Sequence, residues 1–158
     1  MAALRKGLLR RWRSDAGAEF VEFALAFPLL LLVVLGIFDF GLMFQQYEVT
    51  TNAAREGARI AVLPAYQAQL TANVTDRVNQ YINASFLSTG GTVTTTVGAA
   101  QASLIGGVCM STVTVTVRYP HQFLFLAGIG QYFDENFGTK TLTAASTMRT
   151  EVAAASCS

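Results

Sequence analysis

A long uncharged segment near the N-terminus constrains this chain more than any other feature. From Phe23 to Phe38 nothing is more polar than a proline or a glycine, and apolar flanks beyond Glu22 and Asp39 extend the segment from Phe20 to Phe44. At ~1.5 Å per residue, a helix of this length covers about 37 Å, which exceeds the ~30 Å of a bilayer's hydrocarbon core. A core helix of a soluble protein normally keeps a polar stripe, which this segment lacks. The sequence therefore predicts a membrane-spanning helix.

The charges around this segment predict its orientation. Before it, only Asp15 opposes five cations, which are Arg5, Lys6, Arg10, Arg11 and Arg13. Positively charged flanks stay in the cytoplasm, so we expect a cytoplasmic N-terminus and place everything after about Gln45 outside. Residues 18–158 hold six cations and nine anions, although the whole chain sums to +1. The basic run is therefore a topology signal, and no basic surface for nucleic acid is expected.

A cleaved secretory signal is the main alternative for a basic run followed by an apolar one. The apolar run here is longer than the ~7–15 residues of such a signal. Its far end also lacks an Ala-x-Ala cleavage site, because the one Ala-Leu-Ala lies at 24–26, near the beginning of the run. Removal by ordinary signal peptidase is therefore not expected.

A short motif lies where the basic run meets the apolar one. Gly17 is followed by Ala18, and the fifth and sixth residues after the glycine are Glu22 and Phe23. This resembles the prepilin peptidase motif of type IV pilins and pseudopilins, which implies cleavage after Gly17 and a new terminal amine on Ala18. In that family the glutamate pairs with the terminal amine of a neighbouring subunit, which implies the same role for Glu22. The alternative is that Glu19 and Glu22 only favour the positive end of the helix dipole, by ~0.3–1 kcal/mol each.

Three blocks of sequence point to one family within the type IV pilins and pseudopilins. They are GAEFVEFALAFPLLLL from residue 17, GIFDFG from residue 36 and NAAREGAR from residue 52. Over residues 17 to about 62, they resemble in order and spacing the TadE-like family, minor pseudopilins of the tight-adherence (Tad, or Flp) pilus system of bacteria. The resemblance implies a single-pass protein of the bacterial inner membrane with a periplasmic C-terminal domain, associated with the pilus after processing. It also implies a structural role in assembly, with adhesion and biofilm formation as the outcome.

The implied partners follow from the same resemblance. They are the membrane, the prepilin peptidase, the inner-membrane assembly platform, and other Tad pilus subunits and pseudopilins. The competing hypothesis is an unprocessed single-pass membrane protein that acts as a scaffold or binding module of the pilus or secretion machinery. Cleavage at Gly17 distinguishes the two.

Two residues interrupt the apolar helix. Pro28 removes one backbone hydrogen bond and leaves the carbonyl of Ala24 without its partner, so we expect a tolerated bend with a minor role in local melting during assembly. Asp39 lies near the outer boundary of the span, where a carboxylate reaches water. Its alternative role is a contact with a cation of a partner protein.

The helix is predicted to continue to about Ala61 and to end before Pro64, because the residue before a proline disfavours helical geometry. Small residues on one face would allow another backbone or a sheet to approach closely, and they are Thr50, Ala54, Gly57, Ala58 and Ala61. Arg55 and Arg59 occupy another face, as a solvated edge with Glu48 or Glu56 as partners.

Beyond this helix, the sequence predicts a small α+β head domain. A second helix over residues 65–86 carries an apolar stripe formed by Leu70, Val74, Val78, Tyr81, Ile82 and Phe86. Strands with alternating polarity are predicted at 92–97, 112–119 and 139–150. Strands with one wet face suit a three- to four-stranded antiparallel sheet covered by an amphipathic helix. The expected division is a basic cytoplasmic leader at 1–17, the transmembrane helix with its periplasmic extension at 18–62, and the head domain at 63–158.

Three further features of the head domain lead to expectations. The apolar segment 119–133 is too short to span a bilayer, so it either folds its aromatic rings onto the sheet or forms an exposed patch for a partner subunit or the membrane surface. Cys109 and Cys157 are the only cysteines, and an oxidising periplasm favours a disulfide between them. His121 is the only histidine, and we expect it to be solvated at a strand end.

The sequence gives little support for an enzyme. A single histidine excludes a multi-histidine metal site, and neither a phosphate-binding glycine loop nor a Gly-x-Ser-x-Gly motif is present. We therefore expect no catalytic residues, no cofactor or metal, and no small-molecule substrate.

Overall fold

The computed structural model describes residues 15–85, 91–130 and 138–150, and it divides into two compact units, Met1–Phe38 and Asp39–Ser158. Helix α2 (Asp15–Ala61) runs through the end of the first unit and into the second. The structure confirms an α+β fold in which a long apolar helix precedes a small domain. The basic residues 5–13, Phe86 and Cys157 lie outside the described residues.

The first unit consists of the apolar part of α2. One helix of the described chain, Gly17–Ala61, is long and apolar enough to cross a membrane, and none of its most apolar window is buried within the protein. Large side chains such as Phe23, Leu25 and Ile37 are more than half exposed. Such a surface suits a hydrocarbon environment, because lipid replaces the protein core that a soluble helix would need.

The second unit begins with the last part of α2, which ends at Ala61 as predicted. The single helix expected at 65–86 is instead two elements, a 3-10 helix η1 (Pro64–Gln69) and an α-helix α3 (Leu70–Ala84). The side-chain amide of Gln67 donates to the carbonyls of Ala61 and Leu63, at 2.9 and 3.3 Å. The bond to Ala61 satisfies a carbonyl in the last turn of α2, and the two bonds together hold the turn between the helices.

The sheet has four antiparallel strands: β1 (Thr94–Val97), β2 (Gln101–Ile105), β3 (Val108–Gln122) and β4 (Thr139–Thr150). The predicted strand at 139–150 is confirmed, whereas the strand expected at 112–119 is longer at both ends. β2 was not predicted as a strand. It forms a hairpin with β3 through Gly106 and Gly107, whose positive φ angles of 61° and 81° are those of a tight hairpin turn.

The register places β3 in the centre of the sheet. β1 pairs with residues 115–118 of β3 and β2 pairs with residues 108–112, while β4 pairs with β3 from Ser111 to Gln122. Many residues of β3 therefore pair on two sides, with β4 on one side and with β1 or β2 on the other. β1 and β2 therefore follow one another along one edge of β3, and β4 occupies the other edge.

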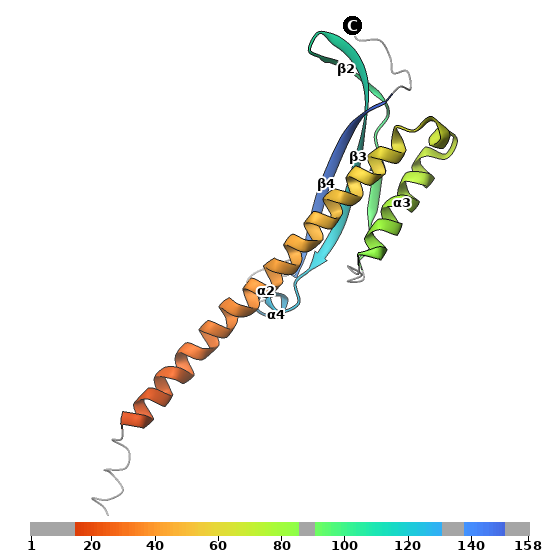
Figure 1. Ribbon diagram of the computed structural model, residues 1–158. Coiled ribbons are helices and arrows are strands. Elements are labelled where there is room, and N and C mark those ends of the chain that lie inside the picture. The colour runs from red at the N-terminus through yellow and green to blue at the C-terminus, as the bar shows by residue number, and fades with distance from the viewer. Residues whose placement is uncertain (1–14, 86–90, 131–137, 151–158) are drawn as a thin grey trace, which may run out of the picture. The chain divides into compact units, whose positions relative to one another are not determined.

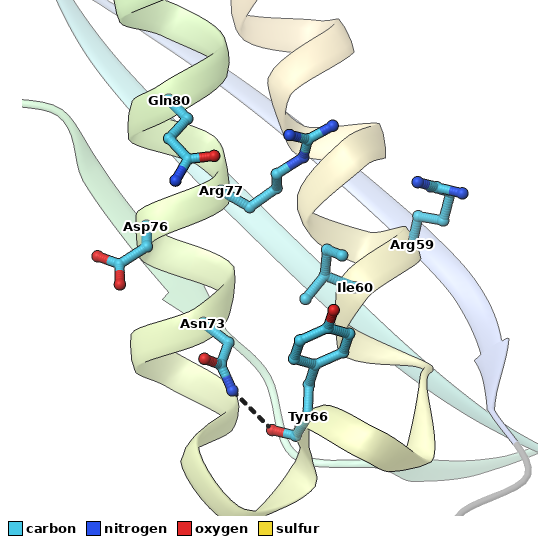
Figure 2. A pocket seen from close by; sticks show the side chains of 7 residues that line it. All are labelled: Arg59, Ile60, Tyr66, Asn73, Asp76, Arg77 and Gln80. Carbon is cyan, nitrogen blue, oxygen red and sulfur yellow. Dashed lines mark hydrogen bonds between the residues drawn. The ribbon is translucent and has the colours of Figure 1, made fainter.

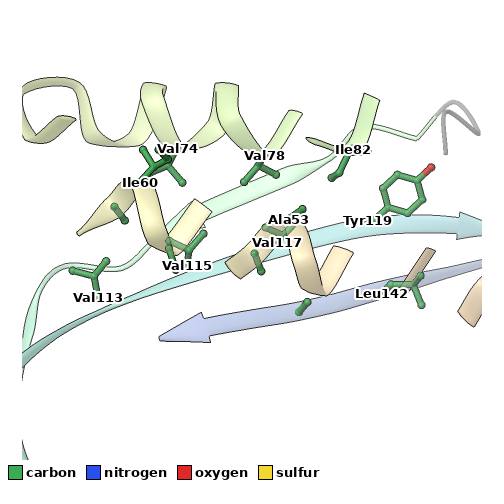
Figure 3. Close-up of a cluster of buried hydrophobic side chains, with 14 residues drawn as sticks. Ala53, Ile60, Val74, Val78, Ile82, Val113, Val115, Val117, Tyr119 and Leu142 are labelled. Atoms are coloured by element: carbon green, nitrogen blue, oxygen red, sulfur yellow. The ribbon is translucent and has the colours of Figure 1, made fainter. Parts of the chain in front are cut away.

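One face of this sheet is covered by α3 and by the part of α2 in the second unit (Figure 1). Side chains from α2, α3, β3 and β4 point into a single core (Figure 3). Along β3 the predicted alternation is confirmed, since Val113, Val115, Val117 and Tyr119 are buried while Arg118 is exposed. The domain thus has one modest apolar core, on the helix-covered face of the sheet.

Candidate functional site

The predicted processing motif lies in the first turns of α2. Gly17, Ala18, Glu22 and Phe23 are exposed, and the Phe23 ring lies 5.4 Å from that of Phe27. Within the part of the chain that the structure describes, no cation lies at salt-bridge distance from the Glu22 carboxylate. The carboxylate is accessible to a partner from another chain, and cleavage after Gly17 stays a prediction.

Pro28 lies inside α2, ten residues after Ala18, and the helix is assigned through it without interruption. Its ring occupies the exposed, apolar part of the helix. The expected bend and the local melting during assembly stay predictions.

Asp39 does not reach water, contrary to the sequence-based expectation. Its exposed fraction is 0%, and its two carboxylate oxygens accept the backbone N–H groups of Leu124, Phe125 and Leu126, at 3.0, 2.9 and 2.7 Å. These donors stand at the start of helix α4 (Leu126–Gly130), where backbone N–H groups have no partner inside the helix. The carboxylate thus binds a segment of its own chain. The alternative expectation was that it would bind a cation of a partner protein.

The segment held by Asp39, residues 123–130, is named here the tip segment. It belongs to the apolar stretch 119–133, whose last three residues lie outside the described chain. Two interpretations were open for this stretch, aromatic rings folded onto the domain or an exposed apolar patch, and each applies to part of it. Phe123 packs against Phe40 and His121, with ring centroids 6.0 and 4.8 Å apart, whereas Leu124 and Phe125 are exposed.

His121 is buried, so the expectation of a solvated histidine was wrong. It is 1% exposed, its Nδ1 is hydrogen-bonded to Oε1 of Gln46, and its ring meets Phe123 edge-on. When Nδ1–H donates to that oxygen, the neutral ring carries its lone pair on Nε2, which has no partner among the described residues. Burial lowers the pKa of His121, although the carboxylate of Asp39 opposes the shift.

We expect the head domain to lose stability as the pH falls below about 6.5, the ordinary pKa of histidine. Since the pKa is lower in the folded state, the unfolded chain binds the extra proton in this window, and the loss continues until the pH reaches the lowered value. Unfolding of the full chain in detergent, followed between about pH 5 and 8, measures the effect. His121→Asn should remove this component, and the same pH dependence in both proteins would contradict the assignment to His121.

Gly57 lies where α2 crosses both α3 and the sheet. A Cβ at this position would stand 2.9 Å from Val78 Cγ2, 3.2 Å from Val115 Cγ1 and 3.3 Å from Val74 Cγ1. Thr50, Ala54 and the other small residues of this face are buried as well. Their small side chains let the backbone of α2 lie close to α3 and the sheet.

A polar hollow of about 450 Å³ opens between α2, η1 and α3 (Figure 2). Its lining residues are Arg59, Ile60, Tyr66, Asn73, Asp76, Arg77 and Gln80. Glu56 next to it binds Arg77 at 2.7 Å and Arg59 at 3.2 Å. The hydrogen bond from Arg77, with help from Arg59, lowers the pKa of Glu56, although burial opposes the shift. The expected pairing of Arg59 with Glu56 is thus present, and the same carboxylate joins α2 to α3.

The charges around this hollow are largely matched, so it offers no strong site for an anion. Neither a histidine nor a cysteine lines it. In the described part of the chain, no group of three or more His, Cys, Asp or Glu side chains is placed to hold a metal ion.

Cys109 lies exposed near the start of β3, in the hairpin with β2. Its expected partner Cys157 lies outside the described residues. The disulfide stays a prediction.

Sequence reasoning missed that Gln46, Asp39 and His121 belong to one buried polar cluster. A signal for the first two was available, because spacings of three and four residues lead backwards from Gly57 through Thr50 to Gln46 and Asp39. The buried face of α2 therefore begins seven residues before Gln46. No comparable pattern marks His121, since its hydrogen-bond partner Gln46 lies 75 residues away in the sequence.

Comparison with known proteins adds one match. Residues 17–59 match the family model of TadE-like proteins, which covers the exposed apolar helix and most of its buried continuation. No curated protein and no solved structure matches the chain. The match begins at Gly17 and includes Glu22, Asp39 and Gly57. Over residues 17–59, the chain is therefore similar to TadE-like proteins.

Proposed function

We propose that this chain is a minor pseudopilin of Tad pilus assembly, processed by prepilin peptidase between Gly17 and Ala18. The observation that carries the proposal is the family match, which begins at the glycine of the processing motif and follows the exposed apolar helix. In this proposal, the chain is anchored in the inner membrane with its N-terminus in the cytoplasm and its head domain in the periplasm. Removal of the leader, residues 1–17, discards all five cations of the cytoplasmic flank and leaves the apolar helix free to join a filament.

Glu22 has a specific role in this proposal. A carboxylate in the apolar packing of a filament is costly without a partner, and the new amine of Ala18 on a neighbouring subunit supplies one. The exposure of Glu22 in the single chain supports this role, as does the lack of a cation beside it among the described residues. Other Tad subunits and the inner-membrane assembly platform are the partners that the filament would require.

We expect Glu22→Gln to abolish pilus assembly while leaving the protein in the membrane. Breaking a buried ion pair costs about 3–5 kcal/mol, so surface pili in a complemented deletion strain should fall by more than about tenfold. Glu19→Gln is the matched control, because it removes a carboxylate from the same helix end at the wrong position. Equal piliation by both variants would reject the role of Glu22. The same result would favour the competing hypothesis, in which the chain is an unprocessed membrane scaffold of the same machinery.

A further inference from the structure

The tip segment exposes large apolar side chains without a single charge among its eight residues, FLFLAGIG. Leu124 is 61% exposed, Phe125 45% and Ile129 42%. The segment folds the ring of Phe123 toward the domain and presents Leu124, Phe125 and Ile129 outward. Water is a poor environment for such a cluster, so a surface of this kind marks a contact site.

The position of the tip segment along α2 is fixed by hydrogen bonds. Asp39 accepts three consecutive backbone N–H groups from it, and Phe40 contacts the ring of Phe123. Asp39 follows Phe38, the last residue of the uncharged run, directly in the chain. The start of the tip segment is therefore held beside the residue at which the uncharged run of α2 ends.

The length of the apolar run gives the depth of Asp39 in a bilayer. If the hydrocarbon region begins at Phe23, the first residue after Glu22, a core of ~30 Å takes ~20 residues and ends near Leu42. Asp39 then lies about 4–5 Å inside that boundary. A free carboxylate at this depth would be costly, whereas one that accepts three N–H groups and is 0% exposed has its oxygens paired.

The same bonds prepare the tip segment for contact with lipid. Backbone N–H groups at the start of a short helix have no internal partner, and lipid offers them none, so each unpaired group would be costly there. In this protein the groups of Leu124, Phe125 and Leu126 are satisfied by Asp39. The large exposed side chains of the segment are thus apolar, and the N–H donors at its start are already paired.

From these observations we propose that the tip segment is a second membrane contact, in which Leu124, Phe125 and Ile129 insert into the leaflet that faces the head domain. The partner is the acyl-chain boundary of a bilayer, and zwitterionic lipid suffices because the segment carries no cation for anionic headgroups. The contact requires only that α2 spans the membrane, so it does not depend on processing at Gly17. This contact would hold the head domain against the membrane surface.

Tryptophan fluorescence tests this contact in the full chain. Trp12 is the only tryptophan, so Trp12→Phe gives a background in which Leu124→Trp or Ile129→Trp reports on one site. The proteins are reconstituted at low density in phosphatidylcholine vesicles, with and without bromine on the acyl-chain carbons near the glycerol. Ile37→Trp in the apolar helix is the positive control, and Tyr66→Trp in η1 is the negative control.

We expect both tip-segment tryptophans to emit at shorter wavelength than the one at position 66 and to be quenched by brominated lipid several-fold more strongly. Quenching as weak as that at position 66, with free access to a water-soluble quencher, would overturn the proposal. So would protection from both quenchers that grows with protein density, because the segment would then cover a second copy of the chain. Having two probe positions keeps the test decisive if one variant fails to fold.

Discussion

Replacing Asp39 with alanine will release the tip segment from α2 and lower the free energy that holds it there by about 2–4 kcal/mol. Hydrogen bonds to a charged group contribute ~1.5–3 kcal/mol each, and the sum is reduced because water reaches part of the freed backbone. The three donors lie at 2.7–3.0 Å from a carboxylate that is fully buried. Amide hydrogen exchange in detergent micelles should show faster exchange at Leu124, Phe125 and Leu126.

Two variants separate this effect from a general loss of charge. Asp39→Asn keeps the size and one acceptor oxygen, so it should have an intermediate effect. Glu48→Gln removes an exposed carboxylate from the same helix and should leave exchange in the tip segment unchanged. Unchanged exchange at all three amides in Asp39→Ala would show that the carboxylate does not hold the tip segment.

Replacing Gly57 with leucine will destabilise the head domain by about 3 kcal/mol or more, at the upper end of what overpacking usually costs. A Cβ alone would stand 2.9 Å from a methyl group of Val78, and the β-branched valines around it have little rotamer freedom. The extra carbons of leucine would push α2 away from both α3 and β3. The expected result is a clear drop in the denaturant midpoint of the full chain in detergent.

Gly41 provides the matched control for this substitution. It lies on the same helix, and a Cβ there would meet nothing within 4 Å. Gly41→Leu should therefore leave the denaturant midpoint nearly unchanged. Equal destabilisation by the two leucines would mean that the loss comes from the helix itself, and the close contact at Gly57 would not be its cause.

Local patterns in the sequence predict much of this fold. The run from Phe23 to Phe38 predicts the membrane helix by its length, and alternation along Val113–Tyr119 predicts the central strand and its buried face. Helical spacing also predicts which side of α3 is buried, because Val74, Val78 and Ile82 recur every four residues. These patterns succeed because each depends on one periodicity in one segment.

Other parts escape such patterns for physical reasons. The strand Gln101–Ile105 has little alternation, and only the glycine pair after it, with both φ angles positive, indicates a hairpin. The helix expected after Pro64 is divided because a 3-10 turn forms first, held by the side chain of Gln67.

The contacts within the buried polar cluster could not be predicted from local sequence. Asp39 and Leu124 are 85 residues apart, and Gln46 and His121 are separated by 75. A polar residue at the end of an apolar run looks solvated unless its partner is known. Only the folded chain brings the tip segment to α2 and gives the carboxylate its three donors.

The intact mass of the protein, isolated from bacterial membranes with and without prepilin peptidase, shows whether the chain is processed at Gly17. We expect the peptidase to remove residues 1–17, so that the mature chain begins at Ala18, and we expect Gly17→Ala to keep the full mass. A full-length mass in both strains would contradict it. The protein would then be a permanent single-pass anchor, and the pairing of Glu22 with a new terminal amine would be excluded.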